Sequence, residues 1–180
     1  MADHGSTSTA RQTTISALFR DKASAERAYD ILMDLGYSRD ETSVVMSDET
    51  RTRYFGDATS ETELGNKALE GAGVGGAIGT VVGGLLGALA AIGTSIALPG
   101  LGIIVAGPLA AALAGAGAGG VTGGLIGALI GSGIPEERAK FYAEGIKGGG
   151  ILISVAPRTA AEAEQIERDW KQLGGDLTSR

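Results

Sequence analysis

The chain has 180 residues, of which 31 are Gly, more than twice the usual share of about 7%. It has no Cys, a single His (His4) and a formal net charge of −6. The lack of Cys excludes disulfides and thiolate metal ligands, and one His in a terminal tail disfavours His-based catalytic or metal sites. The acidic balance disfavours nucleic-acid binding, which needs a basic face. We therefore expect no catalytic residues, no cofactor, no metal and no nucleic-acid partner.

The N-terminal part predicts a disordered tail over residues 1–11 and a β-α-β unit over 12–47. Apolar residues alternate from Ile15 to Phe19, which indicates a strand. A helical pattern follows, with Asp21 placed to cap its start and Gly36 placed to end it. The β-rich run Thr42 to Ser47 predicts a second strand.

Residues 48–70 are expected to form a linker. Within it, Arg51 and Arg53 stand beside Tyr54 and Phe55. This cluster is compatible with an interfacial anchor or a small anion patch, or with a linker whose aromatic side chains cover the sheet edge. We favour the linker interpretation.

The middle of the chain differs from both flanks. Gly71 to Pro135 is a run of 65 residues without a charged, His or aromatic residue, and it holds 21 of the 31 glycines. Two stripes of Gly recur every four residues, which keeps them near one face of a helix and favours close helix contact. The sequence therefore predicts a helical glycine-zipper hairpin over 71–134, with these helix-packing residues: Gly71, Gly75, Gly79, Gly83, Gly87, Gly115, Gly119, Gly123, Gly127 and Gly131.

The two helices of the predicted hairpin would be about 33 and 36 Å long. Either is long enough to cross the hydrocarbon core of a membrane, which is about 30 Å thick. Between them, Gly93 to Gly107 contains the turn signal Pro99-Gly100 and no charge. We expect this hairpin to insert in the cytoplasmic membrane with both soluble halves in the cytoplasm, or to be buried in a cytoplasmic assembly of identical copies. The partners predicted are thus the chain itself and membrane lipid. Two GxGxxG matches, at Gly71–Gly76 and Gly115–Gly120, lack the preceding strand and following acidic residue of a dinucleotide site.

The C-terminal part, 135–180, predicts an extra helix, a strand, a helix and a short terminal strand. Ile153 to Gly174 repeats Ile15 to Gly36 without a gap, which indicates one structural unit used twice. Thr159 and Glu162 have the spacing of a capping box. Two β-α-β halves on one small antiparallel sheet predict an α+β, ferredoxin-like fold interrupted by the zipper hairpin.

Other polar and aromatic residues have simpler explanations. The acidic residues of the predicted helices, such as Asp30, Asp34, Glu164 and Glu167, are expected on solvated faces. Trp170 falls at an apolar position of its helix and is expected in the core.

Three stretches together resemble the general stress protein family with the YflT-type domain. They are "ISALFRDKASAERAYDILMDLGYSRDETSVVMSDE", the zipper core, and "GSGIPEERAKFYAEGIKGGGILISV". The resemblance spans nearly the whole chain and is most specific over Gly133 to Val155. It implies a bacterial stress-response context and brings no catalytic residues with it.

These observations predict a non-enzymatic stress-response protein that self-associates, inserts in the membrane, or does both, through its zipper helices. One alternative is a membrane oligomer that forms a pore or alters permeability, although only a few Ser and Thr residues could line it. Another is a small-ligand sensor built on the ferredoxin-like domain.

Overall fold

A computed structural model describes residues 14–55, 96–98, 102–110 and 123–177. Six antiparallel strands in this part form one sheet, in the order β3-β4-β2-β5-β1-β6. In chain order the strands are β1 (Ile15–Phe19), β2 (Thr42–Ser47), β3 (Ile96–Leu98), β4 (Ile103–Ala106), β5 (Ile151–Val155) and β6 (Asp176–Leu177). The central strand β5 lies between β1 and β2, pairing Ser154 with Ser16 on one side and with Ser43 on the other.

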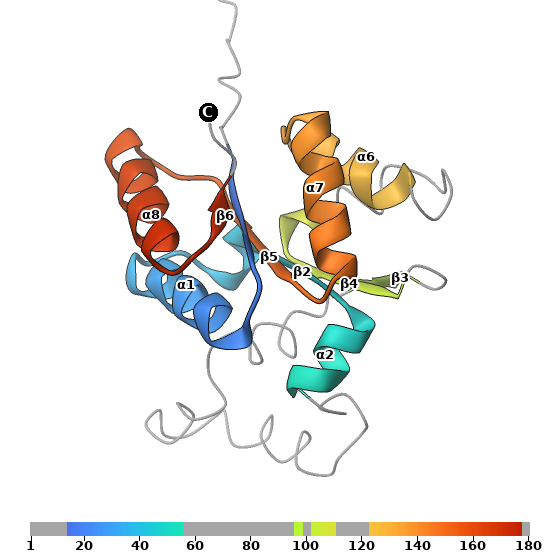
Figure 1. The fold of residues 1–180 in the computed structure, drawn as a ribbon. Coiled ribbons are helices and arrows are strands. Elements are labelled where there is room, and N and C mark those ends of the chain that lie inside the picture. Colours follow the sequence, from blue (N-terminus) through green and yellow to red (C-terminus); the bar gives the residue numbers. More distant parts are fainter. Residues whose placement is uncertain (1–13, 56–95, 99–101, 111–122, 178–180) are drawn as a thin grey trace, which may run out of the picture.

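Helices cover both faces of this sheet (Figure 1). One layer consists of α1 (Lys22–Asp34) and α8 (Ala160–Gln172), and the opposite layer of α6 (Gly123–Gly131) and α7 (Glu136–Lys147). A further helix, α2 (Asp48–Phe55), follows β2, and a short 3-10 turn, η1 (Arg39–Glu41), precedes it. The described part of the chain is therefore an α+β arrangement with a helix layer on each side of one sheet.

Each layer encloses its own apolar core, because alternate strand residues point to opposite faces. Phe19, Met46 and Ile153 face α1 and α8, where Trp170 is fully buried and its indole N–H donates to the carbonyl of Ala28 at 3.1 Å. Trp170 therefore occupies the core position that the sequence predicts. The other core lies under α6 and α7, and there the buried Tyr142 hydroxyl donates to the carbonyl of Ser16 at 2.9 Å.

The internal repeat corresponds to two equivalent helices with equivalent ends. Asp21 accepts from the N–H of Ser24 at 2.8 Å, and Thr159 accepts from that of Glu162 at 3.1 Å, so both predicted N-caps are confirmed. Gly36 and Gly174 follow these helices with φ of 80° and 76°, the left-handed conformation that favours Gly. The strands correspond less closely, since β5 ends at Val155 and Pro157 then lacks the N–H that a longer strand would use.

The structure corrects the prediction in two places. The stretch Gly93 to Gly107, expected as the connection between the two predicted helices of 71–134, contains the strands β3 and β4, and β4 pairs with β2 along four residues. The β-branched run Ile103 to Val105 suits a buried strand, and it covers an edge of β2 that would otherwise be unpaired. Asp48–Phe55, expected within the linker 48–70, is a helix whose start is capped by Ser47, which accepts from the N–H of Thr50 at 3.0 Å.

Candidate functional site

The helical hairpin of α6 and α7 carries the part of the predicted zipper that the structure describes. Gly133 joins the two helices with φ of 95°. Its N–H donates to the carbonyl of Ile130 at 2.9 Å, and the N–H of Ile134 donates to that of Leu129 at 3.0 Å. This pair of bonds is the Schellman pattern that ends a helix at a Gly. Pro135 then directly precedes α7, so local sequence fixes where one helix stops and the next begins.

The inner face of α6 belongs to the core of the molecule. Leu125 and Leu129 are 3% and 0% exposed and join the apolar cluster that also contains Val105 and Ile146. These contacts hold α6 against the rest of its layer. The orientation of α6 about its own axis is thereby set.

The outer face of α6 consists of Gly and Ile. Gly127 and Gly131 are exposed, and a Cβ atom added to either would meet none of the described residues within 4 Å. Ile130 is 41% exposed, one of two exposed large apolar side chains among the described residues, the other being Phe141 on α7. Each helix of this layer therefore presents an apolar side chain outward.

Of the ten predicted helix-packing residues, α6 contains three: Gly123, Gly127 and Gly131. The other seven lie outside the described residues, namely Gly71, Gly75, Gly79, Gly83, Gly87, Gly115 and Gly119. His4 and the predicted tail 1–11 also fall outside them. Among the described residues, no helix combines the length and apolar character that crossing a membrane requires.

A second feature is a hydroxyl-lined pocket of about 260 Å³ at the end of the sheet where β2 starts and β5 finishes. We call it the hydroxyl pocket. Its polar lining comes from four hydroxyl residues and one carboxylate: Thr14, Ser43, Ser132, Ser154 and Glu41. Its apolar lining comes from Pro108, Leu109, Val155 and Ala156. No sequence motif predicts this pocket. The one signal in the sequence is a Ser at the same place in both copies of the repeat, Ser16 and Ser154, since each interrupts an otherwise apolar strand.

Beside this pocket, a polar network joins the two halves of the repeat. Arg158 bonds Glu41 at 3.0 Å and lies over the ring of Tyr37, 4.3 Å from its centroid. Hydrogen bonds from Ser38, with a further contribution from Arg158, lower the pKa of Glu41. Burial and a 2.5 Å hydrogen bond from its hydroxyl to Glu162 raise the pKa of Tyr37. Glu41 is thus an ionised group whose charge is balanced locally.

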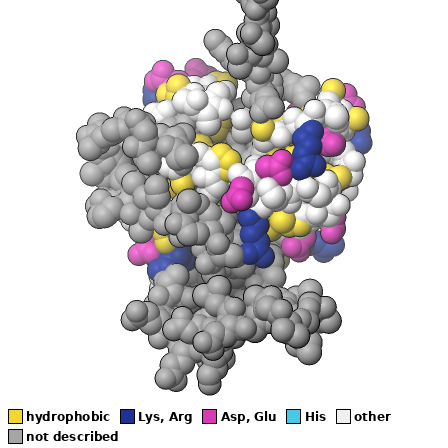
Figure 2. Space-filling model, turned by 180° about the vertical axis from the view of Figure 1, so that it is seen from behind, with side chains coloured by type: hydrophobic (Ala, Val, Ile, Leu, Met, Phe, Trp, Pro, Cys, Tyr) yellow, Lys and Arg dark blue, Asp and Glu magenta, His cyan; other side chains and the backbone are white. Residues whose placement is uncertain are grey.

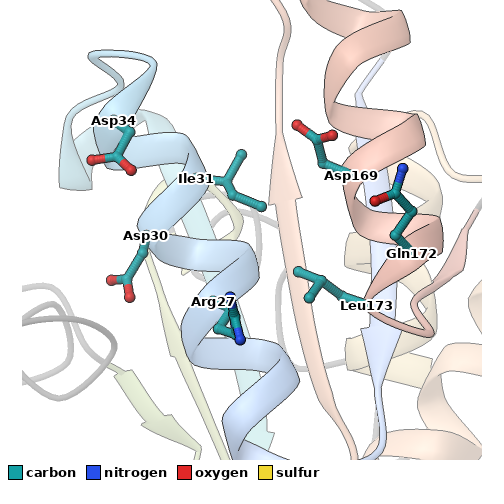
Figure 3. A pocket seen from close by; sticks show the side chains of 7 residues that line it. All are labelled: Arg27, Asp30, Ile31, Asp34, Asp169, Gln172 and Leu173. Atoms are coloured by element: carbon teal, nitrogen blue, oxygen red, sulfur yellow. The ribbon is translucent and has the colours of Figure 1, made fainter.

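A groove of about 400 Å³ runs between α1 and α8 on their outer side (Figure 3). Ile31 of α1 and Leu173, which directly follows α8, project toward the gap. Asp30 and Asp34 are exposed on α1 and also belong to the lining, but in this view their side chains point away from α8. Of the four acidic residues expected on solvated faces, Asp30, Asp34 and Glu164 are exposed and Glu167 is partly buried.

The Arg residues of α2 are paired within their own helix. Arg51 bonds Asp48 at 3.2 Å and Arg53 bonds Glu49 at 2.6 Å, while Tyr54 packs against the core under α1. Because both Arg side chains already pair with carboxylates of their own helix, this arrangement disfavours the interpretation of the cluster as an anion patch. Charged side chains of both signs are dispersed over the face shown in Figure 2, and the described residues contain no group of three or more acidic or His side chains placed to hold a metal ion.

Comparison with family models, with curated proteins and with solved structures finds no match for this chain. The site must therefore be interpreted from its own geometry.

Proposed function

We propose that this chain is a non-enzymatic bacterial stress-response protein that self-associates, inserts in the membrane, or does both, through its glycine-zipper helices. The observation that carries the proposal is the outer face of α6, where Gly127 and Gly131 are exposed although nothing in the described chain requires the absence of a side chain. Gly inside a helix costs about 1 kcal/mol relative to Ala. An external helix that approaches closely would explain why these positions carry Gly.

The partner proposed is a second copy of the same chain. Close packing of Gly-lined helices needs a small-residue surface on both sides, and the period-four Gly pattern of the sequence predicts such surfaces over 71–87 and 115–131 in every copy. The face is uncharged, so an ion-pairing partner would gain nothing there. The resemblance to general stress proteins supplies the biological context.

We further propose that the core of the fold is ferredoxin-like. The order β2-β5-β1-β6 supports this, because β5 lies between the two strands joined by α1, and β1 lies between the two joined by α8. Both helices lie on the same side of the sheet (Figure 1). This is the arrangement expected when two β-α-β halves interlock on one antiparallel sheet.

The decisive experiment replaces Gly127 with Leu in the full-length chain. We expect Gly127→Leu to reduce the mass of the assembly measured by light scattering after size exclusion, or to reduce retention in carbonate-washed membranes, because the Leu side chain blocks close helix approach. Ala161→Leu, at an exposed position of α8, is the matched control and should behave as wild type.

If Gly127→Leu and wild type have the same mass and the same membrane retention, the proposal is wrong. Circular dichroism of both variants checks that the fold is intact. Leakage of dye from liposomes, measured with wild type, separates simple association from pore formation.

A further inference from the structure

The hydroxyl pocket is independent of the outer face of α6 and has its own chemistry. It lies at one end of the sheet, and its four hydroxyl side chains come from the segment before β1, from β2, from the turn after α6 and from β5. We propose that this pocket binds a small neutral polyhydroxylated molecule, of the size of a polyol or a monosaccharide.

The floor of the pocket contains a hydroxyl that lacks a partner among the described residues. Ser154 is 2% exposed, and within the described part of the chain its Oγ has no hydrogen-bond partner. Buried polar atoms are nearly always hydrogen-bonded in native proteins, so such a group requires an explanation. A ligand hydroxyl that reaches the floor would provide the missing partner.

A second hydroxyl stands directly beside the first. Ser43 of β2 is the register partner of Ser154, and directly opposed residues of antiparallel strands have Cβ atoms about 5 Å apart. The Ser43 Oγ accepts from the N–H of Leu109 at 3.1 Å, which uses a lone pair and leaves the hydroxyl proton to be donated. Ser43 therefore offers a donor next to Ser154.

The rim of the pocket offers acceptors. Thr14 donates its hydroxyl proton to the carbonyl of Ser132 at 3.3 Å, and Ser132 donates its own to the carbonyl of Leu129 at 2.7 Å. Both hydroxyl oxygens keep lone pairs that can accept from a ligand. The pocket thus combines donors and acceptors at separate places, which is the pattern that recognises several hydroxyl groups on one molecule.

Charge and size restrict the ligand further. Among the described residues of the lining, Glu41 is the only charged one, and its carboxylate is bonded by Ser38 and Arg158, so this part of the lining offers no cation to hold an anion. Pro108 and Leu109 give an apolar wall for a carbon skeleton. The volume of about 260 Å³ lies below the range of roughly 300 to 1,000 Å³ for drug-sized ligands. A neutral molecule of monosaccharide size or smaller fits the charge, the apolar wall and the volume of the pocket.

The test uses the full-length protein with glycerol, xylitol, myo-inositol and glucose as probes. Saturation-transfer NMR detects binding, and isothermal titration calorimetry gives the affinity. We expect wild type to bind at least one probe and Ser154→Ala to bind it about fivefold more weakly, the effect of losing one ordinary hydrogen bond.

Ser16→Ala is the matched control, since Ser16 pairs with Ser154 in the same cross-strand row but does not line the pocket. Its affinity should equal that of wild type. Failure of all four probes to bind wild type would overturn the proposal and leave the pocket as a water site. Equal affinities for wild type and Ser154→Ala would overturn it as well. Neither Ser lies on α6, so both variants should assemble as wild type does. Measuring their assembly therefore separates a loss of ligand binding from a loss of self-association.

Discussion

Glycines on the two neighbouring helices α6 and α7 have opposite surroundings. On α7, a Cβ atom added to Gly145 would collide with a terminal methyl group of the buried Leu18 side chain, which would have to move. On α6, a Cβ atom added to Gly127 would have no atom of the described chain within 4 Å. The first Gly is explained by packing inside the molecule. The second is not explained within the described residues, and it is this kind of Gly on which the proposed contact with another copy rests.

Gly107, directly after β4, belongs to the first kind and gives the largest expected effect. It has φ of 82°, and an added Cβ would collide with the backbone at Thr42 and Ser43. We expect Gly107→Ala to lower the free energy of unfolding by about 3 kcal/mol or more, since strain and overpacking act together. Urea denaturation followed by circular dichroism measures this. A loss below about 0.5 kcal/mol would show that β4 is not held against β2 as described.

The pair Gly145→Ala and Gly127→Ala tests the comparison within one helix layer. Gly145→Ala should cost about 1 to 3 kcal/mol of unfolding free energy, because Leu18 must move in a filled core. Gly127→Ala, the matched control, should leave the unfolding free energy unchanged or raise it by up to about 1 kcal/mol, the helix-propensity difference. Similar losses in both variants would remove the distinction between the two kinds of Gly.

The smallest expected effect concerns the network between the halves of the repeat. The pKa of Glu41 is lowered in the folded state from its ordinary 4.5. The ionised Glu41 carboxylate therefore contributes to the stability of the fold above pH 4.5, and this contribution is lost as the pH falls through the lowered pKa. We expect Glu41→Gln to lower the melting temperature slightly at pH 7, and we expect this difference from wild type to shrink as the pH falls below 4.5. A difference that persists or grows at low pH would contradict this assignment.

Local signals predicted the repeat layer well. The caps Asp21 and Thr159 and the left-handed Gly36 and Gly174 all act within a few residues of themselves, so the sequence places α1 and α8 correctly. The short terminal strand is likewise confirmed as β6.

The parts of the structure that the sequence did not predict depend on contacts between residues far apart in the chain. Ile103 to Val105 forms a strand because β2 has a free edge for it, and nothing in the surrounding Gly-rich run indicates that partner. The hydroxyl pocket brings together Thr14, Ser43, Ser132 and Ser154, which are far apart in the chain and share no motif. Of the predicted stripe, Gly127 and Gly131 are exposed on α6, and their role in contact with another helix stays a prediction.

Oxidative cross-linking through a single introduced Cys tests the central claim most directly. The chain has no Cys, so Gly127→Cys provides one thiol at the proposed contact and Ala161→Cys provides one at the control position on α8. If outer faces of α6 meet between copies, Gly127→Cys forms a covalent dimer on mild oxidation, at concentrations where Ala161→Cys does not. Equal cross-linking of the two variants, or none in either, would contradict self-association through this face.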